Sequence, residues 1–260
     1  MADKKEAKST REKAAEARAA AQASERRRER MIRIIGGIAV LAVVGIIIGI
    51  GVMNSGGSDN NNSDTPSADS ALPTGITKDN GYGYQVSNPT GKPQVVIYED
   101  FQCPACKQFE TTYGPAVEKW ASAGDIALTY RIMTFLDKNL NTDHSVRAAS
   151  AFGCSINADQ GLPYHNTLYA NQPATEGQGW TDDQLKQFGA DAGITGDAKT
   201  TFDQCVDAGT YKGWAQLSNQ AAFDSGVTGT PTIEVNGQKI ADSALASEQA
   251  LKDALTNPQQ

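Results

Sequence analysis

Residues 34–53 form the longest apolar run in the chain, without a single charged side chain. A helix of that length would span roughly 30 Å, which is the thickness of a bilayer core. The basic flank lies on the N-terminal side, in residues 1–33, so the pattern predicts an uncleaved signal anchor with a cytoplasmic N-terminus. The alternatives are a cleaved signal peptide and a buried core helix. Signal peptides have a shorter apolar core and a better cleavage site, and a core helix of this length would usually show a polar stripe.

The pattern changes twice after this run. Residues 54–80 are rich in Ser, Gly, Asn and Asp and contain few apolar side chains, which predicts a flexible linker. Residues 81–260 mix apolar and polar positions and are long enough for one sizeable core. We therefore expect one folded domain there, on the outer side of the membrane.

Within that domain, strand-like and helix-like patterns alternate at both ends, and a helical block lies between them. The runs with strand character are 95–98, 126–133, 231–235 and 239–241, the last two joined by an Asn-Gly turn. The runs with helix character are 106–120, 145–154, 164–170, a segment starting at 181, 201–206 and 247–255. The order predicts an α/β fold, a mixed sheet core with a helical insertion at about 140–224.

Charge is distributed unevenly between these regions. Residues 1–33 contain 11 Lys and Arg against 6 Asp and Glu, whereas residues 34–260 contain 12 against 24. An acidic main part argues against a nucleic-acid partner, because phosphate binding needs a basic patch.

Two cysteines, Cys103 and Cys106, form a C-x-x-C motif where the first strand becomes a helix. Cys103 would lie at the helix N-terminus with Pro104 in the first turn, where a missing N–H costs nothing. Free N–H groups and the helix dipole stabilise a thiolate there and lower the thiol pKa. Cys106 would lie one turn deeper on the same face, placed to attack a mixed disulfide on Cys103. The motif predicts a thiol–disulfide exchange site that uses no cofactor.

Other uses of this motif fit less well. A structural zinc site needs four ligands, and this is the only C-x-x-C, so we expect no metal here. Haem attachment needs His after the second Cys, where this chain has Lys107. A purely structural disulfide stays open, although so tight a loop constrains the unfolded chain little.

Cys154 and Cys205 remain, and by elimination they are expected to pair as a structural disulfide, with a second redox pair as the alternative. Four cysteines beyond the membrane anchor suit an oxidising compartment. The two histidines, His144 and His165, are expected to be surface or capping residues rather than catalytic bases. Glu99 and Asp100 precede the thiols, where an acid would oppose thiolate formation or relay protons to Cys106.

The segment from Asp100 to Cys106, followed far downstream by Gly226 to Thr232, resembles the DsbA-like branch of the thioredoxin superfamily. The resemblance covers about residues 90–255, includes residues 164–172, and is greatest to membrane-anchored members from actinobacteria. It implies a thioredoxin fold with an inserted helical domain and a cis bond between Thr230 and Pro231. The loop of that bond would lie against the thiols and hold substrate backbone.

The resemblance also implies an activity, which is disulfide donation to secreted or envelope proteins with free thiols. A membrane quinone-linked oxidase would then reoxidise the pair. Two positions depart from better-known members: Ala105 replaces a frequent His between Pro104 and Cys106, and Ile97 replaces a frequent buried Glu. Because both changes bear on oxidant strength, a reductase or isomerase, or a tethered binding or chaperone module, remain alternative functions.

Overall fold

The computed structural model describes residue 67 and residues 69–257. The predicted cytoplasmic tail, the predicted membrane span and most of the predicted linker lie outside these residues. Within the part of the chain that is described, none of the helices is long and apolar enough to cross a bilayer.

The described residues form a five-stranded sheet with strand order β1-β3-β2-β4-β5. The strands are β1 (Tyr84–Gln85), β2 (Gln94–Glu99), β3 (Ala127–Ile132), β4 (Thr232–Val235) and β5 (Gln238–Lys239). The central pair β2 and β3 is parallel, and the other three pairs are antiparallel. A parallel neighbour requires a crossover, and helix α2 (Pro104–Ser122) supplies it.

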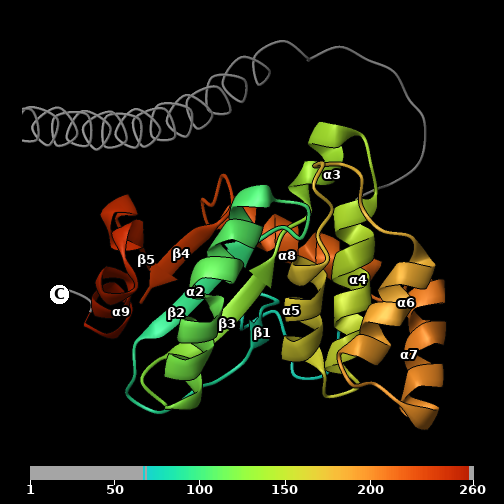
Figure 1. Ribbon diagram of the computed structural model, residues 1–260, viewed down its shortest axis with the longest axis horizontal. Helices are drawn as coiled ribbons and strands as arrows, with labels where there is room; N and C mark the ends of the chain where they lie inside the picture. Colours follow the sequence, from blue (N-terminus) through green and yellow to red (C-terminus); the bar gives the residue numbers. More distant parts are fainter. Residues whose placement is uncertain (1–66, 68, 258–260) are drawn as a thin grey trace, which may run out of the picture. The chain divides into compact units, whose positions relative to one another are not determined.

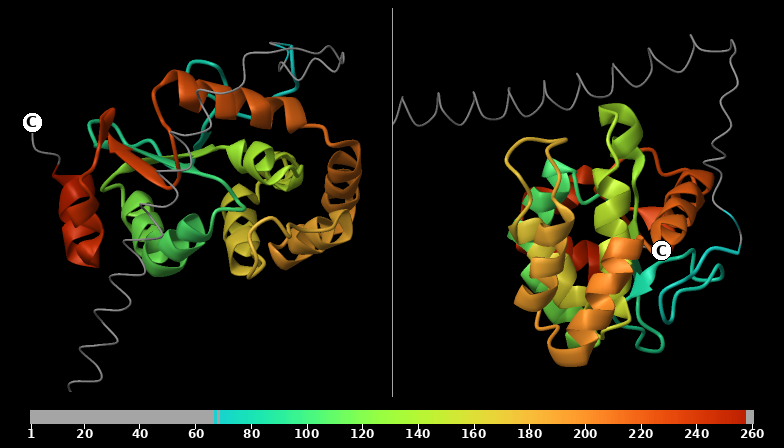
Figure 2. Two further views of the ribbon diagram at one scale, coloured as in Figure 1. Left: turned by 90° about the horizontal axis from the view of Figure 1, so that it is seen from above. Right: turned by 90° about the vertical axis from the view of Figure 1, so that its right-hand side faces the viewer.

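Helices cover both faces of this sheet. Helix α2 and helix α9 (Glu248–Thr256) lie on one face, and helix α8 (Lys212–Asp224) lies on the other (Figures 1 and 2). Side chains of a strand alternate between faces. Accordingly Ile97 belongs to the main core, whereas its neighbour Tyr98 packs in a smaller cluster with residues of α8 and its following loop.

The helical block follows β3 and precedes α8, beside the sheet (Figure 1). Its helices are α3 (Phe135–Leu140), α4 (His144–Ile156), α5 (Gly161–Ala170), α6 (Asp182–Asp191) and α7 (Gly196–Ala208). Helix α6 begins with the capping box that the sequence predicts, in which Thr181 and Gln184 bond each other's backbone N–H. A short 3₁₀ helix, η1 (Asp242–Ala246), precedes α9.

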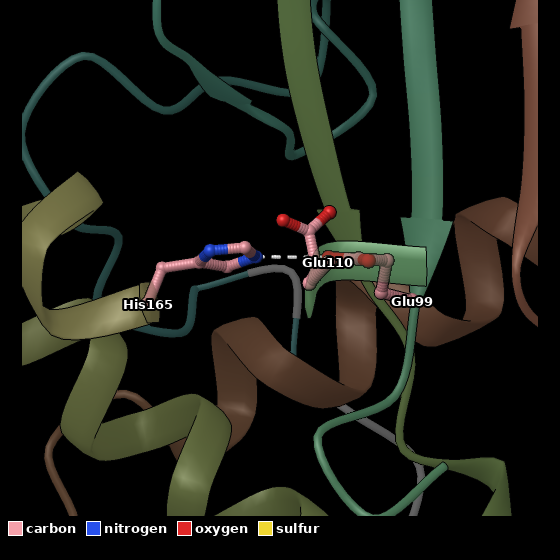
Figure 3. Close-up of side chains that lie close together, drawn as sticks. All are labelled: Glu99, Glu110 and His165. Atoms are coloured by element: carbon pink, nitrogen blue, oxygen red, sulfur yellow. Dashed lines mark hydrogen bonds and ion pairs between the residues drawn. The ribbon is translucent and has the colours of Figure 1, made fainter. Parts of the chain in front are cut away.

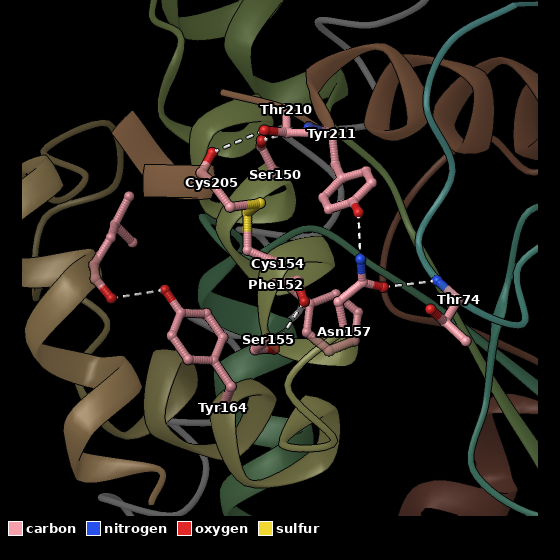
Figure 4. Close-up of a disulfide and its surroundings, with 11 residues drawn as sticks. Thr74, Ser150, Phe152, Cys154, Ser155, Asn157, Tyr164, Cys205, Thr210 and Tyr211 are labelled. Carbon is pink, nitrogen blue, oxygen red and sulfur yellow. Dashed lines mark hydrogen bonds between the residues drawn. A yellow bond between two sulfur atoms is a disulfide. The ribbon is translucent and has the colours of Figure 1, made fainter. Parts of the chain in front are cut away.

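One disulfide ties two helices of this block together. Cys154 of α4 and Cys205 of α7 are bonded, with their Cα atoms 5.9 Å apart (Figure 4). Because the two residues are 51 positions apart, the bond closes a long loop of the chain. The helical block is therefore held by a covalent link as well as by packing.

The pattern does not predict four elements: α3, α8, η1 and β1. Strand β1 has two residues and exists only through its pairing with β3, so no local pattern marks it. Helix α8 buries small and polar side chains, such as Ala215 and Ser218, beside Trp214, which blurs the apolar stripe. The predicted return strand at 239–241 is a two-residue strand, β5.

Some residues before 81, within the segment that the sequence predicts as a linker, already pack on the folded domain. Ile76 is 5% exposed and belongs to the main core. The Thr74 N–H donates to Asn157 Oδ1 at 2.8 Å, and Asn157 in turn donates to the Tyr211 hydroxyl (Figure 4). Ile76 is a single apolar residue in a polar stretch, so the sequence shows no periodicity there. Its burial is visible only in the packed structure.

Candidate active site

Cys103 caps the N-terminus of helix α2, immediately after the loop that follows β2. Its Sγ accepts a hydrogen bond from the Cys106 N–H at 3.3 Å, and Pro104 occupies the first turn. The Cys103 carbonyl accepts the Lys107 N–H at 3.1 Å, which is the first bond of the helix ladder. This is the local geometry that the C-x-x-C spacing predicts, with one sulfur at the open helix end.

The two thiols differ in acidity because their surroundings differ. The Cys106 thiol, assisted by the backbone N–H groups of Cys106 and Ala105, lowers the pKa of Cys103 from 9.0 to about 7, although burial acts in the opposite direction. Burial raises the pKa of Cys106 well above 9.0, and the charges of Cys103 and Glu99 act in the same direction. Cys103 therefore supplies the thiolate, and Cys106 stays protonated beneath it.

A loop from the far end of the chain forms the wall opposite Cys103. The Thr230–Pro231 bond is cis, and the Cys103 thiol donates to the Thr230 carbonyl with sulfur and oxygen 3.5 Å apart. Strand pairing causes this proximity, since Thr232 of β4 lies opposite Tyr98 of β2. The predicted residues Cys103, Cys106, Thr230 and Pro231 are thus brought together, and Pro104 and Ala105 lie exposed beside them.

Asp100 anchors the loop before Cys103 to the helical block. Its carboxylate accepts the Gln102 N–H at 3.0 Å, the Ser145 hydroxyl at 2.6 Å and the Leu136 N–H at 3.2 Å. Burial nevertheless raises the pKa of Asp100 to about 7. Gln102 extends the network through a bond from its amide to Asp137 at 2.8 Å. The loop is held by side chains that lie more than 30 residues further along the chain.

Gln172 holds the same loop from the other side. Its side-chain amide donates to the Phe101 carbonyl at 2.7 Å and to the Cys103 carbonyl at 3.0 Å. The backbone carbonyl of Gln172 accepts a hydrogen bond from the Lys107 ammonium at 2.8 Å. Sequence reasoning did not assign Gln172 a role, although residues 164–172 belong to the segment that carries the family resemblance.

A buried cluster of three ionisable side chains lies on the sheet face that α2 covers (Figure 3). Glu99 ends β2, Glu110 is on α2 and His165 is on α5, and their polar atoms lie within 4.8 Å of one another. His165 Nε2 is 2.8 Å from Glu99 Oε2, and both side chains are 0% exposed. Burial raises the pKa of Glu99 to about 8 and that of Glu110 to about 9.

This cluster corrects the expectation for His165, which is a core residue and neither a surface nor a capping side chain. His144 is the first residue of α4 and is partly exposed. Glu110 was missed, although its position one turn after Cys106 puts it on the buried face of α2. Ile97, at the position where better-known members have a buried Glu, is itself fully buried. Glu99, two residues later on the same sheet face, supplies a buried carboxyl group close to that position.

Comparison with known proteins identifies the family of this chain. A thioredoxin family model matches residues 80–255, which is most of the chain. The chain belongs to the thioredoxin family. Its curated relative, disulfide bond formation protein D of Bacillus subtilis, is 27% identical over 152 residues, 58% of this chain. The match spans 66% of that relative, slightly less than two thirds of its length.

Solved structures of other thioredoxin-family proteins share the fold. Oxidised DsbA from Mycobacterium tuberculosis superimposes with a TM-score of 0.53 and 29% identity, over 66% of this chain and 88% of that one. MdbA, a thiol-disulfide oxidoreductase from Actinomyces oris, superimposes with a TM-score of 0.59 and 21% identity, over 73% of this chain and 90% of that one. The matches support a thioredoxin-like α/β fold for the described domain of this family member.

Proposed function

We propose that this protein is an extracytoplasmic thiol–disulfide oxidoreductase that forms disulfides in secreted or envelope proteins. One observation carries the proposal: an acidic thiol at a helix N-terminus, Cys103, lies above a buried and protonated partner, Cys106. The similarity to disulfide bond formation protein D of Bacillus subtilis and to a disulfide bond oxidoreductase of Mycobacterium tuberculosis supports the same activity.

The exchange begins with the Cys103–Cys106 pair oxidised. A substrate thiolate attacks Cys103 Sγ, the Cys103–Cys106 bond breaks, and Cys106 leaves and takes up a proton. A second substrate thiolate then attacks the substrate sulfur of the mixed disulfide and expels Cys103 as a thiolate. Two electrons pass from the substrate to the pair, and the substrate gains the disulfide. Because a thiol of low pKa is a good leaving group, the acidity of Cys103 favours transfer of the disulfide to the substrate.

The surface around Cys103 suits an extended substrate backbone. Pro104 and Ala105 are exposed on one side, and the cis Thr230–Pro231 loop forms the other. Thr230 presents its carbonyl toward Cys103, so backbone groups are available next to the reacting sulfur. We propose that the loop positions substrate backbone while the sulfurs exchange.

Residues 34–53 would anchor the domain in the cell membrane with the N-terminus inside. The proposed partner for reoxidation is a membrane quinone-linked oxidase, which would take the two electrons from the reduced pair. The Cys154–Cys205 disulfide supports an oxidising location, because such bonds persist mainly outside the cytoplasm.

Trapping of mixed disulfides tests the activity. Replacement Cys106→Ala removes the resolving thiol, so secreted or envelope proteins should stay covalently attached to Cys103, released only by a reductant and identified by mass spectrometry. The double variant Cys103→Ser, Cys106→Ala is the control and should capture nothing. Absence of adducts in the single variant would argue for the alternative of a tethered binding or chaperone module.

The opposite direction, reduction or isomerisation with the same thiols, is the second candidate. The observation in its favour is Ala105, whose side chain supplies neither a cation nor a hydrogen-bond donor to the Cys103 thiolate. Equilibration of the pair with glutathione gives its reduction potential. A value near that of thioredoxin, about −270 mV, would exclude the oxidase and support the reductase.

Orientation is tested separately with a thiol label that does not cross membranes. In intact cells whose surface disulfides have been gently reduced, the label should modify Cys103 of the wild type, and this modification should be absent from the Cys103→Ser variant. Labelling only after the cells are lysed would contradict the proposed topology.

A further inference from the structure

The buried cluster of Glu99, Glu110 and His165 contains more polar atoms than its own hydrogen bonds satisfy. Oxygen Oε1 of Glu99 and Oε1 of Glu110 are both buried and have no partner among the described residues. Buried polar atoms without partners cost free energy, typically about 1–3 kcal/mol each, and call for an explanation.

A fourth group faces the same place. Tyr130 is 0% exposed, and its hydroxyl also has no partner in the described part of the chain. Tyr130 lies opposite Ile97 in the sheet, which puts it on the face that carries Glu99. Its ring centroid is 4.3 Å from that of His165, and the charges of Glu110 and Glu99 act on its hydroxyl. The unpartnered hydroxyl therefore belongs to the cluster.

The backbone of α2 leaves room for the Glu110 carboxylate. Gly114 follows Glu110 by one turn, and a Cβ at that position would collide with Glu110 Oε2. A glycine in the middle of a helix costs roughly 0.5–1 kcal/mol relative to alanine. This glycine lets the carboxylate lie against the helix, with its ligand atom within 4.8 Å of those of Glu99 and His165 (Figure 3).

We propose that Glu99, Glu110 and His165 form a binding site for one divalent transition-metal ion, with the Tyr130 hydroxyl beside it. Two carboxylates and an imidazole are ligands that Zn²⁺ and its first-row neighbours accept. Ligand atoms about 2 Å from an ion lie roughly 3–4 Å from one another, so atoms already within 4.8 Å need small side-chain rotations to bind.

Charge balance supports the same assignment. Metal binding requires the carboxyl groups to be ionised, and two ionised carboxylates in a dry core require compensation. A divalent cation neutralises both and satisfies the free oxygens at once. Glu110 is 7% exposed, whereas Glu99 and His165 are fully buried, so an ion would enter along Glu110. The site does not include the thiols, and its existence does not depend on the proposed function.

The test uses the full-length protein in detergent, without a purification tag and with Cys103 and Cys106 oxidised. All four cysteines are then in disulfides, so no thiolate competes as a ligand. After equilibration with CoCl₂ or ZnCl₂ and dialysis, we expect roughly one ion per chain and visible Co²⁺ absorption typical of a low-coordinate site. The replacement Glu110→Gln keeps the side-chain shape and should weaken binding by at least about tenfold.

The control is Glu248→Gln, on helix α9. Its side chain is exposed and lies outside the cluster, so binding should be unchanged. Nitrogen NMR of the two histidine rings covers the case in which Glu110→Gln does not fold. Zn²⁺ should shift the signals of His165 in the wild type, assigned with His144→Gln.

Three results would overturn the proposal. They are absence of bound metal in the wild type, equal binding in Glu110→Gln, and movement of the His144 signals alone. Any of them would mean that the cluster is neutralised by protons only.

Discussion

At the scale of single residues, the two thiols of one motif have opposite properties because three positions along a helix separate them. Cys103 receives hydrogen bonds at the open helix end, whereas Cys106 is 0% exposed and near the carboxyl group of Glu99. The low pKa of Cys103 is a local consequence of the helix N-terminus. The high pKa of Cys106 is a consequence of its burial in the core.

Alkylation of the reduced protein should reveal this difference. Below a pH of about 7 the Cys103 thiol is protonated and should react slowly, and above it the thiolate should react fast. The rate constant, followed by mass spectrometry, should therefore rise with a midpoint near 7, while Cys106 stays unmodified. Cys103→Ser should lose the fast reaction. A midpoint near the ordinary value of 9.0 would contradict the assigned environment.

Gln172 offers a second test at this scale. The replacement Gln172→Ala leaves the carbonyls of Phe101 and Cys103 without their buried donor, so the free energy of unfolding should fall by about 1–3 kcal/mol. Denaturant unfolding measures the change. Gln187→Ala is the control, because Gln187 is exposed and bonds only Asp191, and should change stability by less than about 0.5 kcal/mol. Equal effects of the two replacements would remove Gln172 from the site.

At the scale of elements, strand order brings the site together. Strand β2 delivers Cys103, and β4, paired beside it, delivers the cis Thr230–Pro231 loop. The helical block supplies the side chains that hold the loop, and its own helices are linked by Cys154 and Cys205. The disulfide thus stabilises the support of the site and not the site itself.

Removing this disulfide should affect stability more than exchange chemistry. The double variant Cys154→Ala, Cys205→Ala should lose about 4 kcal/mol of unfolding free energy, because the closed loop spans 51 residues. Below its unfolding transition it should still exchange disulfides through Cys103 at the wild-type rate. A loss of exchange in the folded variant would instead support a second redox pair, the alternative that the sequence left open.

At the scale of the whole molecule, the described domain includes part of the segment that the sequence predicts to be a linker, residues 54–80. The segment around Thr74 and Ile76 crosses to the end of α4 and closes part of the core. The proposed membrane anchor would therefore be connected to a segment that is itself part of the fold.

A pair of replacements in that segment tests its role. Ile76→Ala should lower the free energy of unfolding by about 2 kcal/mol, because the side chain is 5% exposed. Leu72→Ala, four residues earlier and 36% exposed, should change it by less than about 0.5 kcal/mol. If both variants unfold like the wild type in denaturant, the segment is a linker after all.

The sequence alone determined what depends on neighbours in the chain. The strand-to-helix junction, Cys103 at its end with Pro104 in the first turn, and the capping box at Thr181 follow from local chemistry and were predicted. The family pattern was also recognisable from the sequence, because the motif at Thr230 can be read without knowing where it lies in space.

Only the tertiary structure decided which distant side chains meet. His165 lies 66 residues from Glu99, and Gln172 lies 69 residues from Cys103, so no spacing rule relates them. A buried histidine and a surface histidine look alike in sequence, because burial is a property of the neighbours that packing supplies. The same reason explains Ile76, whose polar surroundings in the chain predict exposure and whose surroundings in space are the core.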